Sequence, residues 1–282
     1  MLVPALAGAS SRPRYRILRA RLWSADSPEN RMRIVVKIGT SLIAPGGRIN
    51  AAWMRSLVDQ FDLTQHEYVM VSSGAIACGM SSLGISQKPR KLDLMQASAA
   101  VGQSQLMHTY ERLFFGKKAV AQLLLSSDDF SSPVRYRNLC NTLNRLLKMN
   151  VLPIVNENDS VSVRELEGAF GDNDELSALV ASAVQADWLV LLTNVDGFYH
   201  RNGKGKPQLL RVIKRVTPEL EANCDSKSAL GRGGMRSKLR AALRATASGI
   251  HVCIANGTEP RVIPLVLDRR VGTYFPPLRT KE

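Results

Sequence analysis

Short apolar runs and helical stripes follow one another along most of the chain. Arg33–Ile38 and Tyr68–Val71 are valine-rich or isoleucine-rich runs that end at glycine or serine, and this pattern predicts buried strands. Leu176–Val184 places apolar side chains at i, i+3, i+4, i+7 and i+8, which is typical of an amphipathic helix. Further strands are predicted at Ala119–Leu125, Val151–Val155 and Trp188–Leu192, and further helices after Asn50, over about Leu92–Phe115 and around Leu139–Leu147.

Strands and helices that alternate at these lengths indicate a mostly parallel sheet with helices on both faces, so the predicted class is α/β. Between residues 33 and 276 the chain has no Pro- or Ser-rich linker and no internal repeat, and we interpret this stretch as one domain. Residues 1–32 are basic and lack the periodicity of a packed element. We expect a disordered extension there, with an organelle-targeting peptide as the minority alternative.

Charge alone leaves two classes of function open. The chain of 282 residues has a formal net charge of +14, which fits a nucleic-acid-binding surface. Residues 1–31 contribute +4 of it, from six arginines against Asp26 and Glu29, and the remainder is spread thinly. An enzyme that handles a nucleotide triphosphate would also gain from a positive field. No apolar run reaches the roughly 18 residues of a membrane-spanning helix, so we expect a soluble protein.

Polar and glycine-rich segments lie where the predicted strands end. Because ligands bind beyond the carboxyl ends of the strands in an open parallel sheet, these segments are candidate binding residues. Lys37 lies in an apolar strand where an unpaired charge is costly, so it needs an anionic partner or ligand. Gly233 and Gly234 precede a predicted helix and leave backbone N–H groups open to a phosphate, with Lys238 one turn further on. The set favours phosphoryl transfer, whose catalysis rests on positioning and charge neutralisation.

The common nucleotide-binding motifs are absent. The sequence has no GxxxxGK[ST] phosphate loop, and no GxGxxG motif follows a predicted strand. The segments that occur instead are Val35–Leu42, Val71–Gly79, Gln96–Gln105, Ile154–Asp159, Gly171–Ala178, Leu191–Tyr199, Gly233–Lys238 and Val271–Phe275. In this order they resemble the glutamate 5-kinase family of the amino-acid-kinase superfamily.

The resemblance implies both a fold and an activity. The implied fold is a three-layer α/β/α sandwich with a mostly parallel central sheet, the amino-acid-kinase fold, over residues 33–276. The implied activity is transfer of the γ-phosphate of ATP to the γ-carboxylate of L-glutamate. This reaction gives glutamyl 5-phosphate and is the first step of proline biosynthesis.

The resemblance also assigns residues by position. It implies that Lys37 and Lys238 contact the transferred phosphate and that Asp174 orients both lysines. The residues implied to hold glutamate are Ser73, Gly74, Ala75, Asp159 and Asn173. The residues implied to bind ATP are Lys37, Thr193, Asn194, Arg232, Gly233, Gly234, Met235, Arg236, Ser237 and Lys238. Mg²⁺ is expected to bind through the nucleotide, with no metal-binding residue on the protein.

Elementary chemistry agrees with these roles. Glutamate brings its own nucleophile, a carboxylate oxygen, so the reaction needs no general base. Its barrier is repulsion between anions, which two lysines and Mg²⁺ would relieve. Asp159 suits the α-ammonium group of the substrate, and Asn173 can donate a hydrogen bond to a carboxylate.

The chain departs from the family pattern at three points. Asn194 stands where many relatives have aspartate, and Arg232 stands where they have threonine, so the departures fall on the implied nucleotide contacts. The chain also ends shortly after Phe275, where many bacterial relatives continue into an RNA-binding-type PUA domain. We therefore expect no C-terminal PUA domain here.

The family resemblance implies partners as well. Proline is expected as a feedback inhibitor, a homo-oligomer (dimer or tetramer) as the assembly, and glutamyl-phosphate reductase as the pathway partner. We expect a cytoplasmic enzyme that binds neither membranes nor a specific nucleic acid. The first alternative is another kinase of the superfamily, acting on aspartate or N-acetylglutamate. The second is a basic nucleic-acid-binding protein without catalytic activity.

Overall fold

A central sheet of seven strands organises the chain in the computed structural model, which describes residues 31–161, 173–200, 206–222, 224 and 234–278. All of these belong to one unit, Arg31–Glu282. The strands in spatial order are β3 (Val120–Leu125), β4 (Leu152–Glu157), β2 (Glu67–Val71), β1 (Arg33–Ile38), β5 (Trp188–Thr193), β8 (His251–Asn256) and β9 (Thr273–Phe275). Every neighbouring pair is parallel except β8 and β9. A separate two-stranded sheet pairs β6 (Tyr199–His200) with β7 (Gln208–Leu209).

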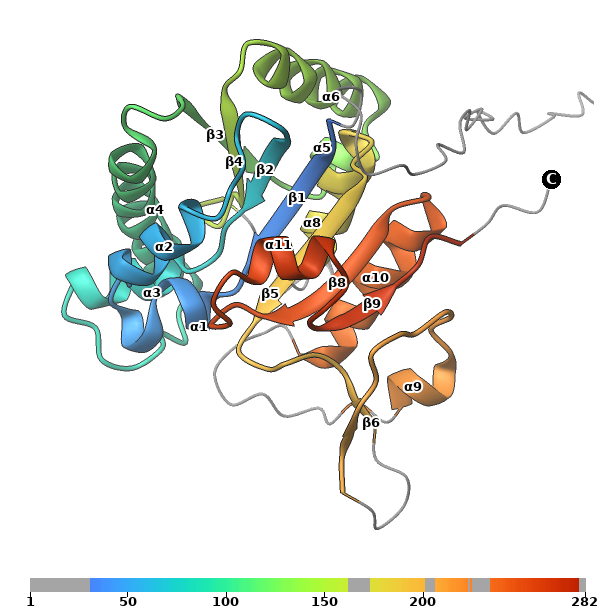
Figure 1. Ribbon diagram of the computed structural model, residues 1–282. Coiled ribbons are helices and arrows are strands. Elements are labelled where there is room, and N and C mark those ends of the chain that lie inside the picture. The colour runs from blue at the N-terminus through green and yellow to red at the C-terminus, as the bar shows by residue number, and fades with distance from the viewer. Residues whose placement is uncertain (1–30, 162–172, 201–205, 223, 225–233, 279–282) are drawn as a thin grey trace, which may run out of the picture. The chain divides into compact units, whose positions relative to one another are not determined.

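Helices cover both faces of the sheet (Figure 1). One apolar core lies between the sheet and a layer that includes α2 (Ala51–Val58), α4 (Leu92–Phe114) and α11 (Val262–Leu267). The second core lies between the opposite face and α6 (Pro133–Lys148), α8 (Asn173–Ala183) and α10 (Met235–Ala247). The remaining helices are α1 (Thr40–Ile43), α3 (Ala75–Ser82), α5 (Asp128–Ser131), α9 (Pro218–Ala222) and the 3-10 turn Pro45–Gly47. The predicted three-layer α/β/α fold is therefore confirmed.

Alternation along β1 decides which layer each side chain faces. Ile34, Val36 and Ile38 pack in the core under α2 and α4, whereas Val35 packs in the core under α8 and α10. Successive side chains of a strand point to opposite faces, so Lys37 shares the face of Val35. The side chain of Lys37, whose burial without a partner would be costly, therefore points toward the α8 and α10 layer.

The order of the strands reverses beside β1. The chain passes from β1 to β2 on one side, and later places β5 on the other side of β1. Lys37 pairs in register with Val71 of β2 and Leu191 of β5, so the three strands end at one level. Such a reversal leaves a crevice at the carboxyl ends of the strands, which is where open α/β sheets bind ligands.

Two glycines let α3 and α4 approach at backbone distance. A Cβ atom at Gly102 would lie 1.8 Å from the Ala75 carbonyl oxygen, and one at Gly79 would lie 1.7 Å from the Ser98 carbonyl oxygen. Both neighbours are backbone atoms, so neither clash can be relieved by a side-chain rotation. The Gly79 and Gly102 pair therefore fixes α4 against the segment that follows β2.

We expect Gly102→Ala to lower the free energy of unfolding by about 2 kcal/mol or more, because overpacking forces the two helices apart. Thermal denaturation measures the effect. Val101→Ala is the matched control, since Val101 is the preceding residue on the same helix and is 37% exposed. Its effect should stay within about 0.5 kcal/mol. Equal melting temperatures for the wild type and Gly102→Ala would show that this contact is looser than the structure has it.

The predicted strands and helices are found with small shifts at their ends. The strand predicted at Val151–Val155 is β4, Leu152–Glu157, and the helix predicted after Asn50 is α2, where Asn50 caps the amide of Trp53. Patterning did not predict β8, β9 or the small β6–β7 sheet. The expected disordered extension over residues 1–32 lies almost wholly outside the described residues.

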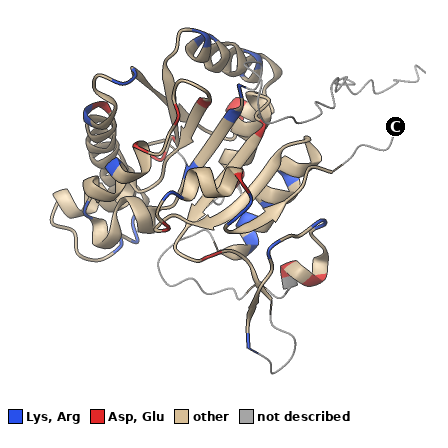
Figure 2. Cartoon of the chain, in the orientation of Figure 1, with Lys and Arg blue, Asp and Glu red and all other residues tan. Residues whose placement is uncertain are grey.

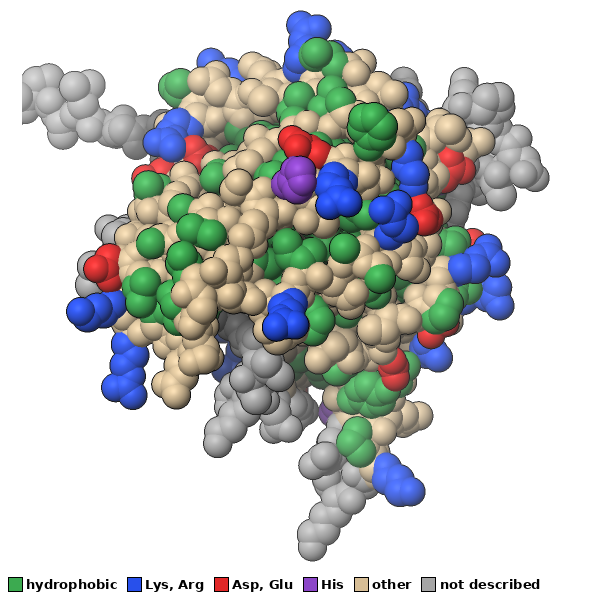
Figure 3. All heavy atoms as spheres, turned by 90° about the vertical axis from the view of Figure 1, so that its left-hand side faces the viewer, with side chains coloured by type: hydrophobic (Ala, Val, Ile, Leu, Met, Phe, Trp, Pro, Cys, Tyr) green, Lys and Arg blue, Asp and Glu red, His purple; other side chains and the backbone are tan. Residues whose placement is uncertain are grey.

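The surface of the described part carries mixed charge. Lys and Arg lie on several helices and loops (Figure 2), and α6 and α10 each carry four of them with no Asp or Glu. On the face turned toward the viewer in Figure 3, apolar and charged side chains are likewise interspersed. None of the described helices combines the length and the apolar character that crossing a membrane would require.

Candidate active site

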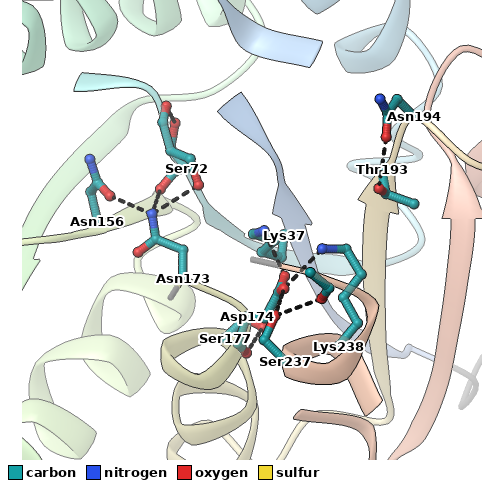
Figure 4. Close-up of polar contacts among 12 residues, drawn as sticks. Lys37, Ser72, Asn156, Asn173, Asp174, Ser177, Thr193, Asn194, Ser237 and Lys238 are labelled. Atoms are coloured by element: carbon teal, nitrogen blue, oxygen red, sulfur yellow. Dashed lines mark hydrogen bonds and ion pairs between the residues drawn. The ribbon is translucent and has the colours of Figure 1, made fainter. Parts of the chain in front are cut away.

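Two lysines from different elements converge on one aspartate. The Nζ atom of Lys37, on β1, lies 2.6 Å from Oδ1 of Asp174. The Nζ atom of Lys238, on α10, lies 3.0 Å from Oδ2 of the same carboxylate. Figure 4 shows both ammonium groups directed at Asp174, which belongs to the first turn of α8. The structure thus brings together the three residues predicted to be catalytic.

The fold explains this convergence. Lys37 points toward the layer that contains α8 and α10, and both helices begin at the end of the sheet where β1 ends. Asp174 lies in the first turn of α8 and Lys238 in the first turn of α10. Helix N-termini carry partial positive charge, so two of them at one site favour an anionic ligand.

The three charged groups are shielded from water. Asp174 is 0% exposed, Lys37 3% and Lys238 5%. Taking charges out of water is costly, and the cost is offset only when opposite charges meet with good geometry. The two lysines and Asp174 together carry a net charge of +1. This trio is therefore suited to hold a negatively charged group that approaches both ammonium groups.

Hydroxyl groups fix the aspartate in place. Ser237 donates from Oγ to Oδ2 of Asp174 at 2.7 Å, and the same hydroxyl lies 2.9 Å from the carbonyl oxygen of Gly234. Ser177 donates to the backbone carbonyl of Asp174 at 2.6 Å. Ser237 was predicted as an ATP contact, and here its hydroxyl supports the carboxylate that holds the lysines.

A second group of polar residues lies on the β2 and β4 side of Lys37. Nδ2 of Asn173 donates to the carbonyl oxygen of Ser72 at 2.9 Å, to Oγ of Ser73 at 2.8 Å and to Oδ1 of Asn156 at 3.1 Å (Figure 4). Oδ1 of Asn173 is buried and has no hydrogen-bond partner among the described residues. In the described structure the donor side of this amide is therefore occupied, and its acceptor side is buried without a partner among the described residues.

This geometry changes the expected role of Asn173. From sequence, Asn173 was expected to donate a hydrogen bond to a substrate carboxylate. A backbone carbonyl such as that of Ser72 can only accept, so the NH₂ group must face it, and Oδ1 must face away. In this orientation Asn173 is suited to accept a hydrogen bond from an ammonium group.

A cavity of about 550 Å³ opens beside these residues, between α4 and the ends of β3 and β4. It includes two residues predicted to hold glutamate, Ala75 and Asp159. Gly74 caps α3 with φ 95°, a left-handed conformation that glycine adopts readily, and it turns the chain from β2 into α3. The cavity is lined by Ala75, Ala99, Ala100, Gln103, Ser104, Met107, His108, Glu111, Gln122, Leu124, Glu157, Asn158, Asp159 and Ser160.

Thr193 and Asn194, two of the residues predicted to bind ATP, lie on the opposite side of Lys37 (Figure 4). Thr193 ends β5, and its hydroxyl lies 3.4 Å from Oδ1 of Asn194. Figure 4 shows this pair apart from the charged trio. Gly234 precedes α10, and Met235 and Arg236 are the first two residues of that helix. Arg236 is exposed and donates to the carbonyl oxygen of Glu221 at 3.4 Å. Arg232 and Gly233 lie outside the described residues.

Sequence reasoning gave no role to Asn156 or Tyr110, two supporting residues on the β2 side. Asn156 is the buried, polar residue before the last position of β4, and it accepts hydrogen bonds from the amide of Glu157 and from Asn173. The hydroxyl groups of Ser72 and Tyr110 lie 2.9 Å apart, and burial raises the pKa of Tyr110, so this phenol stays protonated. A polar residue at the end of an apolar strand was the available signal for Asn156.

Comparison with known proteins agrees with this fold. The family model described as the amino acid kinase family matches residues 32–256. The chain therefore belongs to the amino acid kinase family. A carbamate kinase from Giardia lamblia, solved with bound AMP-PNP, superimposes with a TM-score of 0.58 at 18% identity, covering 89% of this chain and 99% of that one. This likeness shows the fold.

Proteins similar in sequence identify the group within this family to which the chain belongs. The chain is 44% identical to a glutamate 5-kinase of Methanosarcina acetivorans over 260 residues, which are 86% of this chain and 67% of that protein. It is 43% identical to a glutamate 5-kinase of Lactiplantibacillus plantarum over 256 residues, which are 86% of this chain and 96% of that protein. Within the amino acid kinase family, the chain therefore falls among the glutamate 5-kinases, and the predicted resemblance is confirmed.

Proposed function

We propose that this protein is a glutamate 5-kinase, which transfers the γ-phosphate of ATP to the γ-carboxylate of L-glutamate. The product is glutamyl 5-phosphate, and the reaction is the first step of proline biosynthesis. The similarity to proteins named glutamate 5-kinase supports the activity.

The observation that carries the proposal is the position of the lysine pair on Asp174. The charged trio lies at the reversal of strand order, between a polar group with a cavity on the β2 and β4 side and the Thr193 segment on the β5 side. The two ammonium groups are therefore placed where an acceptor on one side and a nucleotide on the other would meet. A phosphoryl group in transfer occupies that point.

The proposed reaction requires charge neutralisation more than proton transfer. An oxygen of the γ-carboxylate attacks the γ-phosphorus, and the bond from that phosphorus to the β–γ bridging oxygen breaks, so ADP leaves. Lys37 and Lys238 neutralise the charge on the transferring phosphoryl oxygens. Asp174 holds both lysines in place in a dry site, where such interactions are stronger than in water.

The polar residues around Asn173 and the cavity beside them are suited to recognise the substrate that receives the phosphate. The free acceptor atom of Asn173 and the carboxylate of Asp159 both suit the α-ammonium group of an amino acid, and Asp159 lines the cavity. An acetylated amine lacks the positive charge and two of the protons. The proposed site therefore selects glutamate over N-acetylglutamate.

Magnesium fits this site as a companion of the nucleotide. Mg²⁺ is commonly bound by substrate phosphates and water with one or two carboxylates, without a cage of protein ligands. Among the described residues, no group of three or more His, Cys, Asp or Glu side chains could form such a cage. When bound with ATP, Mg²⁺ would supply charge neutralisation at the phosphate oxygens, next to Lys37 and Lys238.

An ADP-release assay with Mg-ATP and three acceptors tests the proposal. L-glutamate should support turnover, whereas L-aspartate and N-acetyl-L-glutamate should have kcat/KM values lower by at least about tenfold, or about 1.4 kcal/mol. The assay without any acceptor measures background hydrolysis. Comparable kcat/KM values for glutamate and N-acetylglutamate would remove the proposed pairing with a free α-ammonium group.

The proposal also includes an inhibitor, an oligomeric state, a cellular location and a pathway partner. Proline, which also carries an α-amino acid head group, should compete with glutamate, and inhibition at several glutamate concentrations measures this. Light scattering measures the proposed dimer or tetramer. Cell fractionation tests the proposed cytoplasmic location, and co-purification tests the proposed association with glutamyl-phosphate reductase.

A further inference from the structure

Three side-chain amides form a chain that ends at the proposed acceptor site. Nδ2 of Asn156 donates to Oε1 of Gln103 at 2.8 Å, and Nδ2 of Asn173 donates to Oδ1 of Asn156 at 3.1 Å. Gln103 comes from α4, Asn156 from the end of β4 and Asn173 from the start of α8. Gln103 and Asn156 are both buried. The chain therefore connects three separate elements without solvent between them.

The hydrogen bonds among these three amides all run in one direction, from donor to acceptor. Nδ2 of Asn173 faces a backbone carbonyl, so the NH₂ end of this amide is fixed, and it requires an acceptor at Asn156. Oδ1 of Asn156 supplies that acceptor and also accepts from the amide of Glu157 at 2.9 Å. The NH₂ group of Asn156 then points toward α4 and requires an acceptor in turn, which Oε1 of Gln103 supplies. Rotation of any one amide would set two donors or two acceptors against each other.

The approach of α4 brings Gln103 within reach of β4. Gly102, the preceding residue, lies against the Ala75 carbonyl and the amide of Gly79 with no room for a side chain. This contact fixes the position of α4 along its own axis relative to the start of α3. Gln103 thereby lines the cavity next to Ala75 while its Oε1 bonds to Asn156.

We propose that Gln103 is a positioning residue for acceptor recognition. By accepting from Asn156, it holds the amide chain in the direction that presents Oδ1 of Asn173 to the α-ammonium group of the acceptor. The role lies in binding, because Gln103 belongs to neither the lysine pair nor Asp174. This inference rests on the proposed function, since it deepens how that same site selects an α-amino acid.

Gln103→Met and Gln103→Glu separate positioning from packing. Methionine keeps the length of the side chain without the acceptor oxygen, whereas glutamate keeps an acceptor oxygen for Asn156. We expect Gln103→Met to raise the KM for L-glutamate by about tenfold or more, with kcat within about threefold of the wild type. Gln103→Glu should keep KM within about threefold of the wild type. Gln105→Met is the control, because Gln105 lies on the same helix and donates to exposed Ser82.

Steady-state kinetics and melting temperatures of the full chain and its variants test whether Gln103 positions the amides or only packs. An unchanged KM in Gln103→Met overturns the inference. If Gln103→Met and Gln103→Glu lose kcat to the same extent and also melting temperature to the same extent, Gln103 serves packing. That result overturns the inference as well. A wild-type enzyme that is inactive on glutamate would count against the proposed function itself, whereas an active wild type with an unaffected Gln103→Met variant counts against this inference alone.

Discussion

We expect Lys37→Ala and Lys238→Ala each to lower kcat with L-glutamate by about 10²-fold or more, while the KM for glutamate should change far less. Each substitution removes one of the two ammonium groups at the proposed point of transfer. Charge on the phosphoryl oxygens is greatest during transfer, so the loss should fall on turnover rather than on glutamate binding. Steady-state kinetics with saturating Mg-ATP measures both constants.

Lys117→Ala is the matched control for these two variants. Lys117 also pairs with an aspartate, Asp59, but both side chains are exposed and distant from the proposed site. Exposed ion pairs contribute little to stability, so this variant should retain wild-type kinetics and melting temperature. Near-normal turnover in Lys37→Ala or Lys238→Ala would remove that lysine from the catalytic set.

Asp174→Asn should impair both turnover and folding stability. The substitution leaves two buried ammonium groups without the carboxylate that they share, and breaking a buried pair in this way typically costs about 3–5 kcal/mol. For a domain of this size the melting temperature should fall by about 10 °C. Lys37→Ala should cost less, because it leaves Asp174 paired with Lys238.

Glu175→Gln provides the comparison within the same helix turn. Glu175 pairs with Arg244 at 2.9 Å on the surface, where the loss of one charge has little effect. Thermal unfolding and kinetics of the two variants therefore separate the buried carboxylate from its exposed neighbour. A melting temperature for Asp174→Asn equal to that of Glu175→Gln would contradict the shared-counterion arrangement.

The sequence predicted the central strands because they are buried on both faces and read as continuous apolar runs. Arg33–Ile38 coincides with β1 at both ends, and Trp188–Leu192 lacks only the last residue of β5. The sequence also indicates that an unpaired Lys37 is costly to bury and needs an anionic partner or ligand. That partner, Asp174, came from the family resemblance, because it is 137 residues away along the chain and no local pattern connects the two.

Hydrogen-bond direction could not be predicted from sequence. The resemblance assigns Asn173 to the acceptor site. In the structure its NH₂ group faces the Ser72 carbonyl, and its Oδ1 atom has no hydrogen-bond partner among the described residues. The resemblance assigns Ser237 to the nucleotide, and in the structure its hydroxyl also contacts Asp174. Both contacts depend on which atoms surround a side chain in three dimensions, and sequence spacing does not specify this.

The most direct test of the proposed activity is trapping of the product with hydroxylamine. Acyl phosphates react with hydroxylamine to give hydroxamates, so the wild-type enzyme with Mg-ATP and L-glutamate should form γ-glutamyl hydroxamate in step with ADP release. Lys37→Ala should form it at a rate lower by about 10²-fold or more. ADP release that depends on glutamate but yields no γ-hydroxamate, or hydroxamate formed equally well from L-aspartate, would contradict phosphorylation of the glutamate γ-carboxylate.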